Sequence, residues 1–313
     1  MAVKTAPKAL IFGYIGEKNA GDDLILLATL NNLRAEGARV TALSSNPRLT
    51  EKMFKVRAVQ ARKLLPVLRE LITCDLLVCG GGGIFQDKTS VRSVLYYSLL
   101  VLAARVLSKE IRLLYQGVGP LTTRIGRSFT RAAFNSAGRI SVRDIESWKA
   151  LKELGVKAAN IPVAGDAVQT LRFFSKRRNA KIKTVVFALR ECRDFALHIE
   201  DVVSVSKSLK KAGVICRFVP FQAPQDNLTG LERGGGWDYR KIIREISSAD
   251  VVAGSRYHSL ILADMFGIPF IGINHDAKIE NFCALRKAPL LSLSGNDFKE
   301  RLESCIMKAL MKQ

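Results

Sequence analysis

Short apolar runs alternate with longer segments of helical periodicity along the whole chain. In the first half, the apolar runs predict buried strands at residues 9–14, 40–44, 76–79, 112–116, 140–142 and 161–164. The intervening periodicity predicts helices at residues 23–34, 93–107, 125–136 and 146–154. Alternation of this kind is typical of βαβ units that build a parallel sheet.

The alternation is interrupted by a polar, strongly basic segment at residues 173–183. We therefore predict a first domain at 1–172, a linker at 173–183 and a second domain at 184–313. In the second domain we expect strands at 184–189, 214–220, 250–253 and 269–273, and helices at 197–211, 239–247 and 258–266. The amphipathic segment 296–312 predicts a final helix, which we expect to pack back on the first domain.

These elements predict an α/β fold of two doubly wound, Rossmann-like domains that face a cleft. In such sheets, ligands bind beyond the carboxyl ends of the strands. Loops that directly follow predicted strands are therefore the places to look for a site.

The composition is strongly basic, with 49 Lys and Arg against 28 Asp and Glu and a formal net charge of +21. Such a charge suits nucleic acid, an anionic membrane surface or anionic substrates. Only 7% of residues are aromatic and no nucleic-acid-binding signature occurs, so we expect no nucleic acid partner. The cationic groups are spread along the chain, which favours a protein that works near phospholipid or polyphosphate groups.

No apolar stretch reaches the roughly 20 residues that a membrane-spanning helix needs. A strand and a Gly-rich loop follow the N-terminus in place of a cleavage site. We expect a cytoplasmic protein, with the inner face of the cell membrane as a further place of action. The six cysteines are scattered without a CxxC or Cys/His cluster, so we expect reduced thiols, no metal and no cofactor.

Three Gly-rich segments follow predicted strands in the first half. The first is GYIGEKNAGDD at residues 13–23, which fits neither GxGxxG nor a Walker A loop. Glycines there let the backbone approach a ligand in front of a helix N-terminus. We take Gly16, Asn19, Gly21 and Asp22 as candidate contacts, although Asp22 and Asp23 also suit helix capping.

The other two segments are CGGGGIFQD at residues 79–87 and QGVGP at residues 116–120. Consecutive glycines cost roughly 0.5–1 kcal/mol each to order, which a sequence tolerates where the backbone must approach something closely. A plain tight turn is the alternative. The candidate ligand contacts in these two segments are Gly81, Gly82, Gly83, Gln86, Asp87, Gln116, Gly117 and Gly119.

In the second half, Ser255-Arg256-Tyr257-His258 lies where a strand passes into a helix. Arginine binds carboxylates and phosphates bidentately, and histidine exchanges protons near neutral pH. Of the three histidines, we favour His258 for function over His275 and His198.

Other strand ends carry charged residues too. Arg190 also lies at a strand end, and Lys278 could contribute to an anion site. Arg143 and Asp144 could equally well start a helix.

The blocks GYIGEKNAGDD, GGGGIFQDKTSVRSVLYY, LLYQGVGP, ISVRDIESWKALKELGV and VVAGSRYHSLILADMFGIPFIGINHDAKI, in this order, resemble the polysaccharide pyruvyl transferase family, especially its CsaB-type branch. The resemblance implies a glycosyltransferase-B-like fold and phosphoenolpyruvate as donor. It also implies a ketal-linked pyruvate on a lipid-linked or polymeric sugar acceptor of the cell wall, of the kind that anchors S-layer proteins. With this resemblance we expect the first domain and its Gly-rich loops on the acceptor side, and the second domain on the donor side.

By resemblance, Arg256 and His258 match an Arg-x-His motif that binds the donor and takes part in catalysis. Arg190 matches a donor-binding arginine, and Ser255 and Lys278 lie beside these positions. The sequence departs from the family pattern at Ser255 and Tyr257, where Met and Leu are common. It also lacks a proline after Asp276, which leaves the acceptor open.

Two other functions compete with pyruvyl transfer. A nucleotide-sugar-dependent glycosyltransferase of cell-envelope glycan synthesis would share the architecture, because fold does not dictate function. A basic scaffold protein at the membrane would explain the charge, but it would leave the Gly-rich strand ends and His258 without a role.

Overall fold

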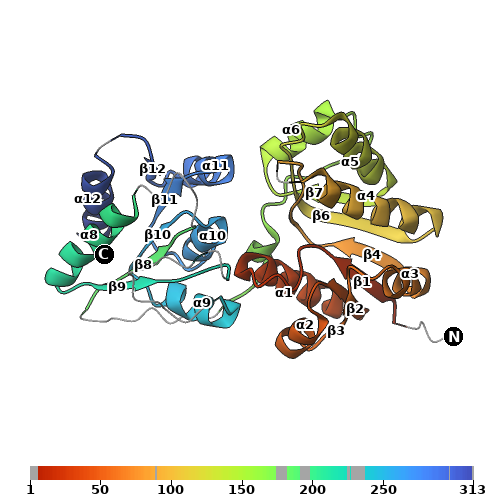
Figure 1. Ribbon diagram of the computed structural model, residues 1–313, viewed down its shortest axis with the longest axis horizontal. Coiled ribbons are helices and arrows are strands. Elements are labelled where there is room, and N and C mark those ends of the chain that lie inside the picture. The colour runs from red at the N-terminus through yellow and green to blue at the C-terminus, as the bar shows by residue number, and fades with distance from the viewer. Residues whose placement is uncertain are drawn as a thin grey trace. The chain divides into compact units, whose positions relative to one another are not determined.

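The computed structural model describes residues 6–88, 90–173, 182–190, 198–223, 226, 237–295 and 297–311. The chain divides into two compact units (Figure 1). The first contains the chain up to Glu17 and Asp22–Leu171, and the second contains Lys18–Gly21 and the chain from Arg172 onward. The four-residue insertion Lys18–Gly21 is not part of the predicted division. Most of the predicted linker, residues 174–181, lies outside the described residues.

The first unit contains a parallel sheet and its covering helices. In chain order, its elements are β1 (Lys8–Phe12), α1 (Ala20–Ala35), β2 (Arg39–Ser44), α2 (Pro47–Phe54), β3 (Arg57–Gln60), α3 (Leu64–Thr73), β4 (Leu76–Cys79), β5 (Gly82–Phe85), α4 (Val91–Val106), β6 (Glu110–Val118), α5 (Arg124–Ser136), β7 (Arg139–Val142), α6 (Ile145–Glu153) and η1 (Ala167–Thr170). From its edge the sheet runs β3-β2-β1-β4-β6, and both β5 and β7 pair with β6.

Period-2 alternation explains how the first sheet is covered on both faces. Leu10 and Phe12 of β1 and Leu77 of β4 point into one core, which also contains inner residues of α3, α4 and α5. Their neighbours Ala9 and Ile11 point to the other face and are equally buried. Figure 1 shows α3 and α4 on one side of this sheet and α1 and α2 on the other.

The second unit contains a five-stranded parallel sheet in the order β12-β11-β10-β8-β9. Its elements are β8 (Thr184–Ala188), α8 (Ile199–Lys211), β9 (Ile215–Phe218), α9 (Tyr239–Ser247), β10 (Val251–Gly254), α10 (Tyr257–Met265), β11 (Phe270–Asn274), α11 (Ala277–Arg286), β12 (Leu290–Ser292) and α12 (Phe298–Met311). Helices α8 and α12 share one core with the sheet, and Figure 1 shows α10 and α11 on its other side.

One predicted strand is not observed: the segment 161–164 makes only an isolated bridge from Val163 to Val142. The predicted final helix is α12, and its Phe298, Leu302 and Ile306 are buried in the core of the second sheet.

Candidate functional site

The second sheet changes its winding direction between β8 and β10. These strands are neighbours, yet β9 lies outside β8 and β11 lies outside β10. The loops at their carboxyl ends therefore run apart and leave room for a ligand at that edge. Arg190, Ser255 and His275 follow β8, β10 and β11 at this edge.

The backbone at the switch point is held by Ser255. Its side chain is 2% exposed, and its Oγ accepts the backbone N–H of Arg190 at 2.7 Å. The N–H groups of Ser255 and Arg256 both donate to the carbonyl of Ala188, at 3.0 and 3.2 Å. Ser255 therefore fixes the points from which the Arg190 and Arg256 side chains leave the sheet.

The guanidinium of Arg256 is oriented by a buried carboxylate. Arg256 Nε donates to Asp226 Oδ2 at 2.9 Å, its Nη2 contacts Asp226 Oδ1, and its Nη1 donates to Gln222 Oε1 at 3.2 Å. Asp226 Oδ2 also accepts the backbone N–H groups of Phe221 and Gln222. A fork held on one side by a carboxylate keeps a fixed direction, which favours selective binding of an anion.

His258 lies in the first turn of α10, beside a segment from the N-terminal end of the chain. Residues Lys18–Gly21 pair with Phe221–Ala223 through N–H···O bonds from Ala20 to Phe221 (2.8 Å) and from Ala223 to Lys18 (3.2 Å). A methyl group at Gly21 would lie 2.8 Å from Cε1 of His258. The predicted loop residues Asn19 and Gly21 thus belong to the second unit, next to the predicted catalytic histidine.

His275 lies within electrostatic range of both site arginines. Burial lowers the pKa of His275, and the positive charges of Arg190 and Arg256 lower it further, which outweighs the opposite effect of Asp276. Lys278 follows in the first turn of α11, where its Nζ pairs with Asp276 at 3.3 Å.

Two helices begin at this edge, which adds to its preference for anions. Arg256 is the N-cap residue of α10, and Asp276 caps α11 by accepting the N–H of Lys278 at 3.1 Å. The N-terminal end of a helix carries partial positive charge and free N–H groups. Together with Arg190 and Arg256, these helix ends form an edge suited to a small, multiply charged anion.

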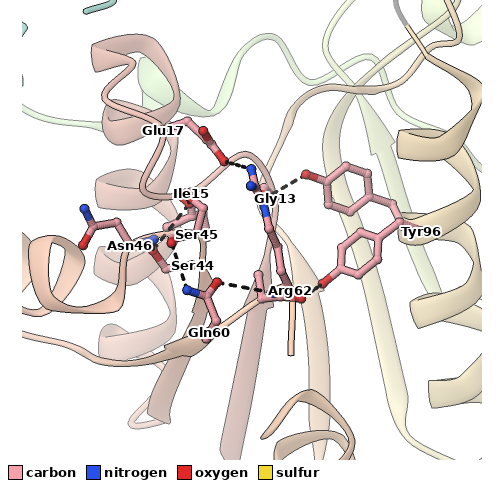
Figure 2. Close-up of polar contacts among 11 residues, drawn as sticks. Gly13, Ile15, Glu17, Ser44, Ser45, Asn46, Gln60, Arg62 and Tyr96 are labelled. Atoms are coloured by element: carbon pink, nitrogen blue, oxygen red, sulfur yellow. Dashed lines mark hydrogen bonds and ion pairs between the residues drawn. The ribbon is translucent and has the colours of Figure 1, made fainter. Parts of the chain in front are cut away.

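In the first unit, the loop after β1 is held by the loop after β2 (Figure 2). Gly16 has φ +86°, and a methyl group there would lie 2.7 Å from the backbone nitrogen of Asn46. The carbonyl of Ile15 accepts the N–H of Ser45 at 2.9 Å. Gly16 is therefore required for the close approach of two loops, which is a structural role for a predicted acceptor residue.

Two further candidates, Asp22 and Gly82, lie close together in the first unit. Asp22 is in the first turn of α1, and its Oδ1 would lie 3.6 Å from a methyl group at Gly82. Gly81 and Gly82 have φ of +130° and +97°, which only glycine adopts readily. Gly82 and Gly83 belong to β5, so the predicted long glycine loop is only two residues, Gly80 and Gly81.

Asp87 joins the end of β5 to the start of α5. Its two carboxylate oxygens accept from the N–H and hydroxyl groups of Thr122 and Thr123 at 2.6 to 3.0 Å. Burial acts to raise the pKa of Asp87, but these hydrogen bonds outweigh it and lower the pKa to about 2. Asp87 thus organises a loop, and its neighbour Gln86 accepts the N–H of Lys88 at 3.0 Å.

Gln116 and Gly117 lie within β6, which continues two residues beyond the predicted end of this strand at residue 116. Gln116 is fully buried, and its amide donates to the carbonyls of Cys79 and Leu114 at 3.2 and 2.7 Å. A methyl group at Gly117 would lie 2.6 Å from the guanidinium carbon of Arg143. Gly119, with φ +86°, does follow the strand.

The remaining candidates have structural partners. Asp144 is the N-cap residue of α6 and accepts the N–H of Ser147 at 2.7 Å. His198 contacts Asp201 at 3.0 Å and the carbonyl of Leu293 at 2.7 Å. Within the described part of the chain, no three His, Cys, Asp or Glu side chains form a group suited to a metal ion.

A family model for polysaccharide pyruvyl transferases matches residues 19–277. The match includes the cluster at the β8–β10 switch point, which consists of Arg190, Ser255, Arg256, His258 and His275. The chain belongs to the polysaccharide pyruvyl transferase family. This family member is therefore a transferase of polysaccharide biosynthesis, as the motifs predicted. No curated protein shows significant similarity to it.

Solved structures similar to this transferase include sugar-nucleotide enzymes. The UDP-GlcNAc 2-epimerase of Methanocaldococcus jannaschii has a TM-score of 0.63 and 12% identity, and the match covers 97% of this chain and 92% of that one. The glycosyltransferase SnogD of Streptomyces nogalater has a TM-score of 0.54 and 14% identity, and the match covers 98% of this chain and 94% of that one. At these identities the similarity shows the fold alone, and it confirms the predicted α/β fold of glycosyltransferase-B type.

The structure brings together Arg190, Ser255, Arg256 and His258 of the predicted donor site, with Gly21 beside them. The sequence analysis missed Asp226 and Gln222, which orient Arg256 from a polar segment without helical or strand periodicity. It also ranked His275 low, although its position directly after β11 could have been used to find it.

Proposed function

We propose that this transferase moves the pyruvyl group of phosphoenolpyruvate onto two hydroxyl groups of one sugar in a cell-surface polysaccharide precursor, forming a cyclic ketal. The observation that carries the proposal is the cluster at the β8–β10 switch point. Two arginines and two helix N-termini there offer separate partners for a carboxylate and a phosphate. The family supports a sugar acceptor.

In the proposed mechanism, Arg190 and Arg256 bind the carboxylate and phosphate of the donor. His258 donates a proton to the methylene carbon, which becomes a methyl group, and the adjacent carbon becomes electrophilic. A sugar hydroxyl adds to that carbon and loses its proton. The C–O bond to phosphate then breaks, the second hydroxyl adds at the same carbon, and its proton leaves with the phosphate.

The arginines also stabilise the charge that moves onto the leaving phosphate. The guanidinium of Arg256 is oriented by Asp226 before the donor binds, and such a preorganised group needs little rearrangement in the transition state. Ser255 fixes the backbone from which the Arg190 side chain extends. In this mechanism His275, which directly follows β11 at the same edge of the sheet, accepts a proton from an attacking hydroxyl.

A nucleotide-sugar glycosyltransferase is the second candidate. It is favoured by the similarity to structures such as the Staphylococcus aureus MnaA–UDP complex, which has a TM-score of 0.63. In that case the same arginines would bind a diphosphate. The leaving group separates the two reactions, since one releases inorganic phosphate and the other a nucleoside diphosphate.

The test is phosphate release from phosphoenolpyruvate with a lipid-linked or synthetic acceptor that contains N-acetylmannosamine. We expect acceptor-dependent release by the wild type and a loss of about 10²–10⁴-fold in His258→Ala, the usual contribution of an acid–base group. His198→Gln is the matched control and should keep its turnover. Near-normal turnover of His258→Ala would remove His258 from the mechanism. Donor binding without release would exclude this acceptor, and the absence of donor binding would favour the glycosyltransferase.

A further inference from the structure

The outer surface of α3 and α4 exposes an unusual number of large apolar side chains. Leu64 and Leu65 of α3 are 77% and 78% exposed, and Leu68 and Ile72 follow at 41% and 51%. On α4, Tyr96, Leu99 and Val106 are also exposed. We call these seven residues the α3–α4 face. Contiguous exposed apolar surface of this kind is typical of an interaction site.

Helix geometry explains why these side chains are not part of the core. Val67 and Leu71 of α3 are buried against the sheet, and at 3.6 residues per turn Leu64, Leu68 and Ile72 form an adjacent stripe. On α4, the spacing of Tyr96, Leu99 and Val106 likewise gives one stripe.

Both ends of α3 are tied to residues of or next to α4. Tyr96 Oη donates to the carbonyl of Ala61, just before α3, at 2.7 Å. At the other end, Lys109 Nζ donates to the carbonyl of Ile72 at 2.7 Å. The two apolar stripes therefore belong to one surface.

Positive charge surrounds this surface. Exposed cationic side chains lie on or directly before the two helices, at Arg62, Lys63, Arg69, Arg92 and Arg105. Two nearby carboxylates are engaged by arginines: Glu70 accepts from both Nη atoms of Arg57 at 2.7 and 2.6 Å, and Glu17 pairs with Arg62 at 3.1 Å. Asp75, which follows α3, accepts the backbone N–H of Lys8 at 2.8 Å. The surface thus combines apolar side chains with a rim of net positive charge.

We propose that the α3–α4 face docks onto an anionic lipid bilayer. Leucines on one helix face with Lys and Arg beside them are the pattern of helices that lie in the membrane interface. Anionic lipids attract each nearby Lys or Arg by about 1 kcal/mol. No helix in the described part of the chain is long and apolar enough to cross a membrane.

The α3–α4 face adjoins the loop after β1, which belongs to the candidate acceptor side. Figure 2 shows Arg62 extending to Glu17 in the loop after β1, with Tyr96 beside it. Tyr97 Oη donates to the carbonyl of Gly13 in the same loop at 3.3 Å. Docking would hold this loop at the bilayer surface, which suits an acceptor sugar on a lipid carrier. The lipid-linked acceptor rests on the proposed function, whereas the docking itself does not.

Sedimentation with vesicles tests the docking without donor or acceptor. The probe is vesicles of equal parts phosphatidylcholine and phosphatidylglycerol, with pure phosphatidylcholine for comparison. We expect the wild type to bind the anionic vesicles, and Leu64→Ser/Leu65→Ser/Leu68→Ser to bind at least about tenfold less. Leu285→Ser, which changes a leucine that is 73% exposed on α11, is the matched control and should bind as the wild type does.

A charge reversal tests the rim. We expect Arg69→Glu to reduce binding about tenfold, while Lys207→Glu on α8 has little effect. Because the changed side chains are exposed, circular dichroism should show folded variants, and Leu65→Ser alone replaces the triple variant if that one unfolds. Equal binding by the wild type and the leucine variants would overturn the proposal. It would also be overturned by self-association that the leucine variants abolish without any vesicle binding, which would assign the face to a second copy of the chain.

Discussion

Gly21 leaves the space in which the imidazole of His258 lies. A methyl group built on Gly21 would be 2.8 Å from Cε1 and 2.9 Å from Cγ of the ring. Carbon atoms in contact pack at about 3.5–4.0 Å, so any side chain at residue 21 displaces the histidine. A glycine of the N-terminal loop thereby determines where a C-terminal side chain can lie.

The first prediction concerns this contact. Gly21→Ala should lower turnover by about 100-fold, since a displacement of about 1 Å at a catalytic group costs that much. Thermal stability should change little, because alanine is favoured in the first turn of a helix. Turnover and melting temperature are the measurements. The control is Gly138→Ala, where the nearest atom to a methyl group would be the carbonyl oxygen of Ile111 at 3.8 Å, an ordinary contact. Normal turnover of Gly21→Ala would show that the ring position is not required.

A second prediction concerns the carboxylate that holds Arg256. Asp226→Asn removes its negative charge, so the guanidinium loses its fixed direction, and we expect the KM for the donor to rise about tenfold. Asp238→Asn is the control. Asp238 also pairs with an arginine, Arg240, at 2.9 Å and caps α9, and asparagine caps equally well. Steady-state kinetics for the donor is the measurement, and an unchanged KM in Asp226→Asn would contradict the assignment.

His275 allows a prediction about its titration. Burial and the charges of Arg190 and Arg256 lower its pKa from the ordinary value of 6.5, so the folded protein binds this proton less readily than the unfolded chain. His275 therefore lowers the free energy of unfolding as the pH falls below the unfolded-state pKa. NMR titration of the ring should give a pKa below 6.5, and Arg190→Gln should raise it. No change of the pKa in Arg190→Gln would show that the arginine does not act on this ring.

Asp87 should stabilise the first unit in a pH-dependent manner. Its folded-state pKa of about 2 lies below the unfolded value, so its contribution is complete above about pH 4 and is lost between about pH 4 and pH 2. One pKa unit corresponds to about 1.4 kcal/mol, which makes the contribution on the order of 2 kcal/mol at neutral pH. Urea unfolding should show Asp87→Asn less stable at pH 7. A difference from the wild type that does not shrink at low pH would contradict this.

The sequence predicted several elements of both units at their observed positions. The strand at residues 76–79 was predicted at its observed bounds, and the helix at 239–247 likewise, because clear apolar periodicity fixes such elements. The analysis missed α3, whose apolar residues face solvent as well as the core. Apolar residues lie on both the buried and the exposed sides of this helix, so the sequence lacks the alternation of apolar and polar positions by which a helix is predicted.

The candidate site was predictable only where residues directly follow a strand. Arg190, Ser255 and Arg256 meet because β8 and β10 are neighbours, which the doubly wound pattern implies. Asp226 reaches Arg256 from a segment with no periodicity, and no local rule pairs the two. Gln116 was expected as the last residue of a strand, but β6 continues to Val118 and pairs with β5 at Gln116 and Val118.

The insertion of Lys18–Gly21 into the second unit has a consequence for the order in which the protein matures. These residues are synthesised before most of the first sheet, but their partners Phe221–Ala223 and the ring of His258 are synthesised only after that whole sheet has been made. The nascent chain therefore cannot complete the surroundings of His258 until most of the second sheet has also been made. By the same reasoning, a fragment that begins at Arg172 would lack one side of those surroundings, however well its own sheet folds.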